Sequence, residues 1–170
     1  MRVASFERVA GALAKHEVRY LLVGGMAAIA HGLNRTTVDL DFVVQLAPNN
    51  VRRAMMAFAE IGYRPQAPVR AEDFADPEIR RQWIVAKQMI VFQLVADVPD
   101  AYPVDVFVAE PFDFDREWAA SPQVELAPDL FVPVLNLPRL LALKLAAGRP
   151  NDLDDIRRLQ KLFPHVEPAD

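Results

Sequence analysis

Two aspartates, Asp39 and Asp41, lie one residue apart in an otherwise apolar run that continues to Val44. Polar and apolar residues alternate from Thr37 to Phe42, which predicts a β-strand there. Because successive side chains of a strand point to opposite faces, Thr37, Asp39 and Asp41 would share one face. Side chains two positions apart lie roughly 7 Å from each other, and like charges on one face repel. The pattern therefore predicts either the solvated face of an edge strand or two carboxylates that bind a divalent cation such as Mg²⁺.

A glycine pair, Gly24-Gly25, precedes these aspartates. It follows a short apolar run, Tyr20 to Val23, that predicts a buried strand, and it opens an alanine-rich stretch that predicts a helix closed by Gly32. Residues without a Cβ let backbone N–H groups and the positive end of a helix approach an anion. The pair is typical of a phosphate-binding turn, and a plain tight turn explains the same two residues.

A third carboxylate would complete a metal site, and Asp105 is the candidate. It lies in the middle of the apolar run Tyr102 to Val108, which predicts another strand. An unpaired charge is costly to bury there, so Asp105 is either a ligand or a salt-bridged or half-exposed strand residue. Asp97 and Asp100 are weaker candidates, because they lie in the predicted turn before that strand.

These motifs resemble a known family. Gly24-Gly25, then Asp39-Leu-Asp41, then Asp105 on a later strand is similar to the signature of the nucleotidyltransferase superfamily of the DNA polymerase β type. The segment that runs from Arg35 through Thr37 to Asp41 is most similar to the small bacterial branch of AbiEii-type toxins and minimal nucleotidyltransferases.

A second block, Leu140 to Ile156, resembles the helical block that follows the catalytic core in that branch. The resemblance covers most of residues 20–159. It implies an α+β nucleotidyltransferase fold, in which helices flank a mixed β-sheet and a short helical segment follows. Residues 1–170 are expected to form a single domain, with a core at about 18–135 and C-terminal helices at about 137–162.

The resemblance also implies roles for the acids and the glycines. Asp39 and Asp41 would bind the Mg²⁺ or Mn²⁺ that carries the nucleoside triphosphate. Together with Asp105 they would bind a second ion at the acceptor hydroxyl, and Asp105 would assist its deprotonation. Gly24 and Gly25 would cradle the phosphates.

Three further residues are assigned to nucleotide binding. Lys144 would reach the phosphates as a point charge, or it complements the dipole at the end of a helix closed by Gly148. Asp152 follows in the same block, and it or Asn151 alternatively caps the next helix. Arg35 would anchor a phosphate, or pair with one of the two aspartates of the first motif.

The expected function is transfer of a nucleoside monophosphate from an NTP such as ATP to a hydroxyl group. The acceptor is an RNA end, a protein or a small molecule, and the chain is a possible toxin–antitoxin component with a cognate toxin or antitoxin as its partner. The alternative is a non-catalytic module of the same fold, acting as an antitoxin or scaffold. A complete set of three acids favours the enzyme.

Composition limits these possibilities. The net charge of −4 argues against a dedicated nucleic-acid binder, which would carry a strong positive field. The absence of cysteine excludes disulfides and thiol chemistry. The longest uncharged apolar stretch, Leu21 to Ala30, is well short of the roughly 18 residues that suggest a membrane span. We therefore expect no membrane association and a cytoplasmic location.

Overall fold

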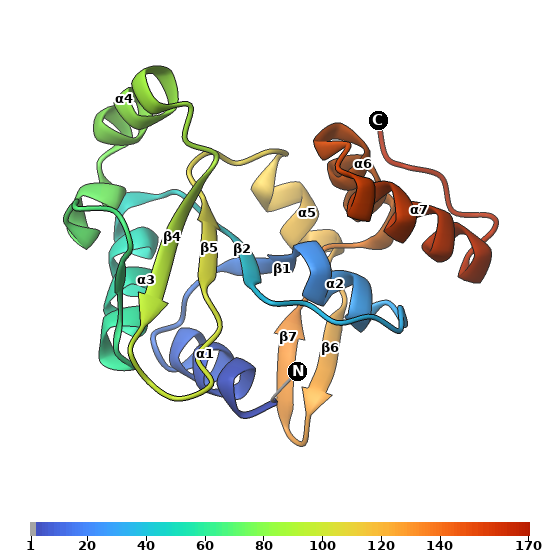
Figure 1. Ribbon diagram of the computed structural model, residues 1–170, viewed down its shortest axis with the longest axis horizontal. Helices are drawn as coiled ribbons and strands as arrows, with labels where there is room; N and C mark the ends of the chain where they lie inside the picture. The colour runs from blue at the N-terminus through green and yellow to red at the C-terminus, as the bar shows by residue number, and fades with distance from the viewer. Residues whose placement is uncertain (1–2) are drawn as a thin grey trace.

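The computed structural model describes residues 3–170, and a five-stranded sheet forms its centre (Figure 1). The spatial order is β1-β2-β5-β4-β3, in which β2 and β5 are parallel and all other neighbours are antiparallel. The predicted mixed sheet is thus confirmed. The strands are β1 (Tyr20–Val23), β2 (Leu40–Val44), β3 (Tyr63–Pro65), β4 (Val91–Ala96) and β5 (Val104–Phe107).

Helices flank this sheet. Helix α1 packs against α3, and α3 contacts β2 and β3, whereas α2 follows β1 directly and contacts α6. Figure 1 shows α6 and α7 side by side, on the side of the sheet where α2 lies. The helices are α1 (Val3–Lys15), α2 (Gly24–Ala30), α3 (Pro48–Glu60), the 3₁₀ helix η1 (Ala71–Ala75), α4 (Pro77–Lys87), α5 (Phe114–Ala120), α6 (Leu137–Ala147) and α7 (Pro150–Leu162).

An aromatic stack fixes the segment between β3 and β4. The ring of Phe92 on β4 lies between Phe74 of η1, at 4.9 Å between ring centroids, and Trp83 of α4, at 5.4 Å. All three rings are buried. Their burial removes a large apolar area from water, and it holds η1 and α4 against the sheet.

The hairpin of β6 (Gln123–Ala127) and β7 (Leu130–Pro133) brings the C-terminal helices to β1. Val134, just after β7, pairs with Leu22 of β1, and the Leu135 amide donates to the Leu22 carbonyl at 3.0 Å. Helix α6 begins two residues later, where the Asn136 side chain caps it by accepting from the Arg139 amide. The chain therefore starts α6 next to the strand that leads into Gly24.

One strand prediction was wrong at its start. Strand β2 begins at Leu40, so Thr37 and Asp39 lie in the preceding loop instead of in the strand. The Thr37 hydroxyl donates a hydrogen bond to the Asp39 carboxylate and also lies near the main-chain oxygen of Asp39. Local side-chain bonds of this kind compete with strand pairing, and ladder bonds begin only where the Leu40 amide donates to the Pro103 carbonyl.

Within residues 3–170, no helix combines the length and the apolar character that crossing a membrane requires.

Candidate active site

Three carboxylates meet where β2 and β5 run side by side. Asp41 and Asp105 are register partners in this parallel pair, so their side chains leave the sheet on the same face. Asp39 approaches from the loop before β2. Asp39, Asp41 and Asp105 each offer an oxygen atom, and these atoms all lie within 4.8 Å of one another. The predicted convergence of this acid triad is therefore confirmed.

Gly24 makes room for the middle acid of the triad. It has a φ of +65°, and a Cβ at this position would lie 2.0 Å from Asp41 Oδ2. Its neighbour Gly25 is also crowded, because a Cβ there would lie 2.6 Å from Thr37 Oγ1. Both glycines are thus required by side chains of the protein itself, a reason for the pair that the sequence did not reveal.

Hydrogen bonds hold the two outer carboxylates of the acid triad. Thr37 Oγ1 donates to Asp39 Oδ1 at 3.0 Å, and Gln93 Nε2 of β4 donates to Asp105 Oδ1 at 2.8 Å. Gln93 is the register partner of Asp105. Sequence reasoning missed Gln93, although an amide in the apolar run of β4 was a signal that this position faces polar groups.

The electrostatics of the acid triad reflect crowded negative charge. Burial raises the pKa of Asp41 to about 7, and the charges of Asp39 and Asp105 add to this effect, while Arg149 and Lys144 oppose it. Burial and the charge of Asp39 also raise the pKa of Asp105, against the hydrogen bond from Gln93. The site therefore favours a bound cation.

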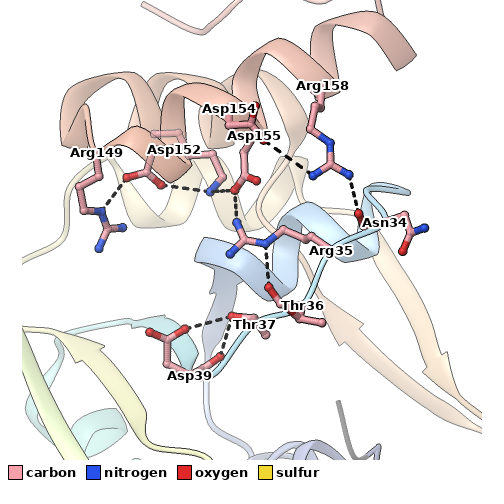
Figure 2. A network of polar contacts seen from close by, with 11 residues as sticks. Asn34, Arg35, Thr36, Thr37, Asp39, Arg149, Asp152, Asp154, Asp155 and Arg158 are labelled. Atoms are coloured by element: carbon pink, nitrogen blue, oxygen red, sulfur yellow. Dashed lines mark hydrogen bonds and ion pairs between the residues drawn. The ribbon is translucent and has the colours of Figure 1, made fainter.

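A network of ion pairs lies beside the acid triad and joins α6, α7 and the loop before β2 (Figure 2). Lys144 Nζ donates to Asp155 Oδ2 at 2.8 Å and to Asp152 Oδ1 at 3.3 Å. Arg149 Nε donates to Asp152 Oδ2 at 2.6 Å, and Arg35 pairs with Asp155. Lys144, Asp152 and Asp155 are each at most 4% exposed, so the centre of this network is buried.

The network corrects two of the alternatives derived from the sequence. Arg35 pairs with Asp155 of α7 and not with an aspartate of the first motif, because α7 packs beside the loop that carries it. Neither Asp152 nor Asn151 caps α7, since its N-cap residue is Arg149 and no side chain caps it. Burial alone would raise the pKa of Asp152, but the hydrogen bond from Arg149 and the nearby cations outweigh it and lower that pKa.

Arg149 is the residue of this region to which the sequence gave no role. Its side chain is 74% exposed, and its charge acts on both Asp41 and Asp105. Lys144, in contrast, is enclosed by the two aspartates that it binds. Arg149 thus combines access to solvent with closeness to the acid triad, which only the packing of α7 against the site could reveal.

The donor set and its charge fit a divalent metal. Carboxylate oxygens are the ligands that Mg²⁺ and Mn²⁺ prefer. When all are ionised, the acid triad and the network together carry two more negative than positive charges, and one divalent cation would neutralise this excess. The groups counted are Asp39, Asp41, Asp105, Asp152 and Asp155 against Arg35, Lys144 and Arg149.

Comparison with known proteins gives a consistent result. Residues 9–164 match the family described as nucleotidyl transferase AbiEii toxin of type IV toxin–antitoxin systems. Among solved structures, the antibiotic-resistance factor ANT(2'')-Ia matches with a TM-score of 0.61 at 12% identity, over 95% of this chain and 84% of that one. A putative nucleotidyltransferase from Thermotoga maritima, TM1012, matches with a TM-score of 0.58 at 13% identity, over 94% and 92%. No curated protein is significantly similar in sequence. The two structures show that the fold is that of nucleotidyltransferases.

We expect Asp41→Asn to stabilise the metal-free protein at pH 8. Folding raises the carboxyl pKa from about 3.9 in an unfolded chain to about 7, so the folded state loses stability as the pH rises from about 4 to about 7 and does not regain it above 7. The uncharged amide avoids this loss, and a gain of about 1 kcal/mol would raise the Tm by about 3 °C. Thermal unfolding in EDTA should show the gain at pH 8 and none near pH 4.

Asp97→Asn is the control for this experiment, because Asp97 is an exposed residue that pairs with Arg64 on the surface. It should show no comparable gain. An Asp41→Asn variant that is less stable than the wild type in EDTA at pH 8 would contradict the electrostatic account.

Gly24→Ala should destabilise the protein more than Gly148→Ala does. Both glycines have a left-handed backbone, with φ of +65° and +62°, so each substitution carries a strain of about 1–2 kcal/mol. Only at Gly24 does the added methyl also collide with the Asp41 carboxylate; at Gly148 its nearest contact is the Leu145 carbonyl at 3.7 Å. Urea unfolding measures both losses, and equal values would show that Asp41 moves aside freely.

Proposed function

The chain belongs to the AbiEii nucleotidyltransferase toxin family, and we propose that it is a metal-dependent enzyme that transfers a nucleoside monophosphate from an NTP to a hydroxyl acceptor. Family membership establishes nucleotidyl transfer in a toxin–antitoxin context. The observation that carries the finer proposal is the acid triad, in which Asp39, Asp41 and Asp105 converge from a loop and two strands.

In this proposal the acids of the triad are the metal ligands, and Asp105 also accepts a proton. Mg²⁺ or Mn²⁺ at these carboxylates would neutralise phosphate charge and make the acceptor hydroxyl more acidic. The acceptor oxygen forms a bond to the α-phosphorus, the bond between the α-phosphorus and the bridging oxygen breaks, and pyrophosphate leaves. Asp105, which lies opposite Asp41 in the register of β2 and β5, would accept the hydroxyl proton.

The glycine turn and Arg35 are proposed to contact the nucleotide phosphates. Helix α2 begins at Gly24 without a side-chain cap, which leaves the first N–H groups of Gly24 and Gly25 as donors. Arg35 lies at the same turn, since its Nη2 would be 3.5 Å from a Cβ on Gly25. The contacts to Thr36 and Asp155 use Nε and Nη1, so Nη2 is the nitrogen that would contact a phosphate.

Lys144 and Asp152 are proposed to act on the nucleotide from within the network. The Lys144 charge lowers the pKa of Asp41 and so favours its metal-binding form, while Asp152 orients Arg149 through their hydrogen bond. Arg149, exposed and beside the acid triad, is then the cation that contacts the triphosphate directly. This differs from the sequence prediction, in which Lys144 reached the phosphates itself.

The acceptor and the partner are proposed in chemical terms. An RNA end, a protein side chain or a small molecule each supplies the required hydroxyl group. The toxin–antitoxin context supports a cognate antitoxin as the partner. ATP is one of the four nucleotides to be compared as donors.

Wild-type protein should transfer label from an α-labelled NTP only in the presence of Mg²⁺ or Mn²⁺, and Asp41→Asn should lower this activity about 1,000-fold, since metal ions supply several kcal/mol of charge stabilisation. The assay follows incorporation into RNA and protein fractions with each of the four nucleotides, and EDTA should abolish it. Asp97→Asn serves again as the matched control. Equal activity of Asp41→Asn and the wild type would favour the non-catalytic module instead.

Lys144→Met and Arg149→Met should separate stability from nucleotide binding. Lys144→Met removes the buried cation that Asp152 and Asp155 share and leaves each with one arginine partner, so it should cost about 3–5 kcal/mol of unfolding free energy. Arg149→Met removes an exposed cation whose partner Asp152 keeps Lys144, so it should cost less stability than Lys144→Met does. It should weaken NTP binding about 10-fold, the value of one charged hydrogen bond. Urea unfolding and calorimetric titration with NTP and Mg²⁺ measure the two effects. A stable Lys144→Met variant with weakened NTP binding would instead support direct contact by Lys144.

A further inference from the structure

Two uncharged side chains hold the outer carboxylates of the acid triad. We propose that Thr37 and Gln93 are positioning residues, each of which occupies one oxygen of a carboxylate and thereby presents the other oxygen to the metal. The bonds concerned are those from Thr37 to Asp39 Oδ1 and from Gln93 to Asp105 Oδ1. The inference rests on the proposed metal-dependent function and assigns residues to which the motif gives no role.

Thr37 is fixed by close packing. It is 7% exposed, and its hydroxyl lies so near Gly25 that a Cβ there would be only 2.6 Å away. A side chain with this little free space is held to one rotamer. Its hydroxyl lies 3.0 Å from Asp39 Oδ1 and 3.3 Å from the Asp39 main-chain oxygen, so the carboxylate is the nearer acceptor.

The loop that carries Thr37 is itself fixed to α7 (Figure 2). Arg35 pairs with Asp155 and donates from Nε to the Thr36 carbonyl at 3.0 Å. Arg158 of α7 donates to the Asn34 carbonyl. The position of the Thr37 hydroxyl therefore depends on contacts to the C-terminal helices as well as on Gly25.

Gln93 is fixed by the sheet. Its strand β4 is the antiparallel neighbour of β5, and the register places it directly opposite Asp105. Cross-strand partners share one face of the sheet, so the amide reaches the carboxylate without leaving the strand. Asp41, between the two outer acids, is restrained differently, by its close packing against Gly24.

Such outer contacts change metal affinity measurably. Mutation of a residue that orients a metal ligand lowers the metal affinity about 10- to 100-fold. A residue with a purely structural role would change the thermal stability and leave the affinity of the folded protein alone. Metal affinity therefore distinguishes positioning from packing.

The test is calorimetric titration of the full chain with Mn²⁺ in the absence of nucleotide. Thr37→Val keeps the shape of the side chain but removes the hydroxyl, and we expect it to weaken Mn²⁺ binding about 10- to 100-fold. Thr37→Ser keeps the donor and should bind nearly as tightly as the wild type. Thr36→Val is the matched control, because Thr36 is the exposed neighbour. Gln93→Met should weaken binding in the same way as Thr37→Val.

The outcomes separate this inference from the proposed function. A wild-type protein that does not bind Mn²⁺ would overturn the metal-dependent function. A wild-type protein that binds Mn²⁺, with unchanged affinity in both Thr37→Val and Gln93→Met, would overturn the positioning role alone. Thermal melts confirm folding, and if Thr37→Val does not fold, Gln93→Met decides. Excess Mn²⁺ should restore nucleotide transfer to the positioning variants, which would not occur if the defect were in packing.

Discussion

Mutual repulsion among three carboxylates is the constraint around which this structure is arranged. The register of β2 against β5 places Asp41 beside Asp105, and Asp41 packs against Gly24 so closely that a Cβ at this glycine would collide with its carboxylate. The free energy of forming the sheet and burying the core thus offsets the cost of holding the acids together. Such stored electrostatic cost is typical of sites that bind a cation in their working state.

The ion-pair network forms the second half of the site, and its centre lies in the C-terminal helices α6 and α7. Lys144 is surrounded by Asp152 and Asp155, and this arrangement satisfies three charges that would each be costly to bury alone. Because Arg35 shares Asp155 with Lys144, the loop before β2 is held by the same pair of helices. The C-terminal helices are therefore part of the site and do not merely follow the core.

The sequence predicted the parts of the fold and site that depend on short-range patterns. Alternation and apolar runs located β1, β2 and β5 and identified Asp39, Asp41 and Asp105, although Asp39 lies before its strand. The family resemblance indicated the C-terminal helices. The sequence could not predict contacts set by packing between distant segments. Arg35 meets Asp155 across 120 positions, Gln93 reaches Asp105 through sheet register, and the crowding at Gly24 comes from a side chain on another strand. Lys144 was located correctly on its helix, but its neighbours follow from how α7 turns back on α6.

The pairing of Val134 and Leu135 with β1 also has a consequence for the order in which the site forms during synthesis. All three acids of the triad have left the ribosome once residue 105 has emerged, whereas Lys144 and Arg149 appear about 40 residues later, and translation proceeds at roughly 5–20 residues per second. For several seconds the nascent chain thus carries the acids without these two cations. The positive charges that favour ionised Asp41 arrive only when Val134 and Leu135 pair with β1 and α6 and α7 take their places, so the site is completed by the last helices and not by the sheet that contains its acids.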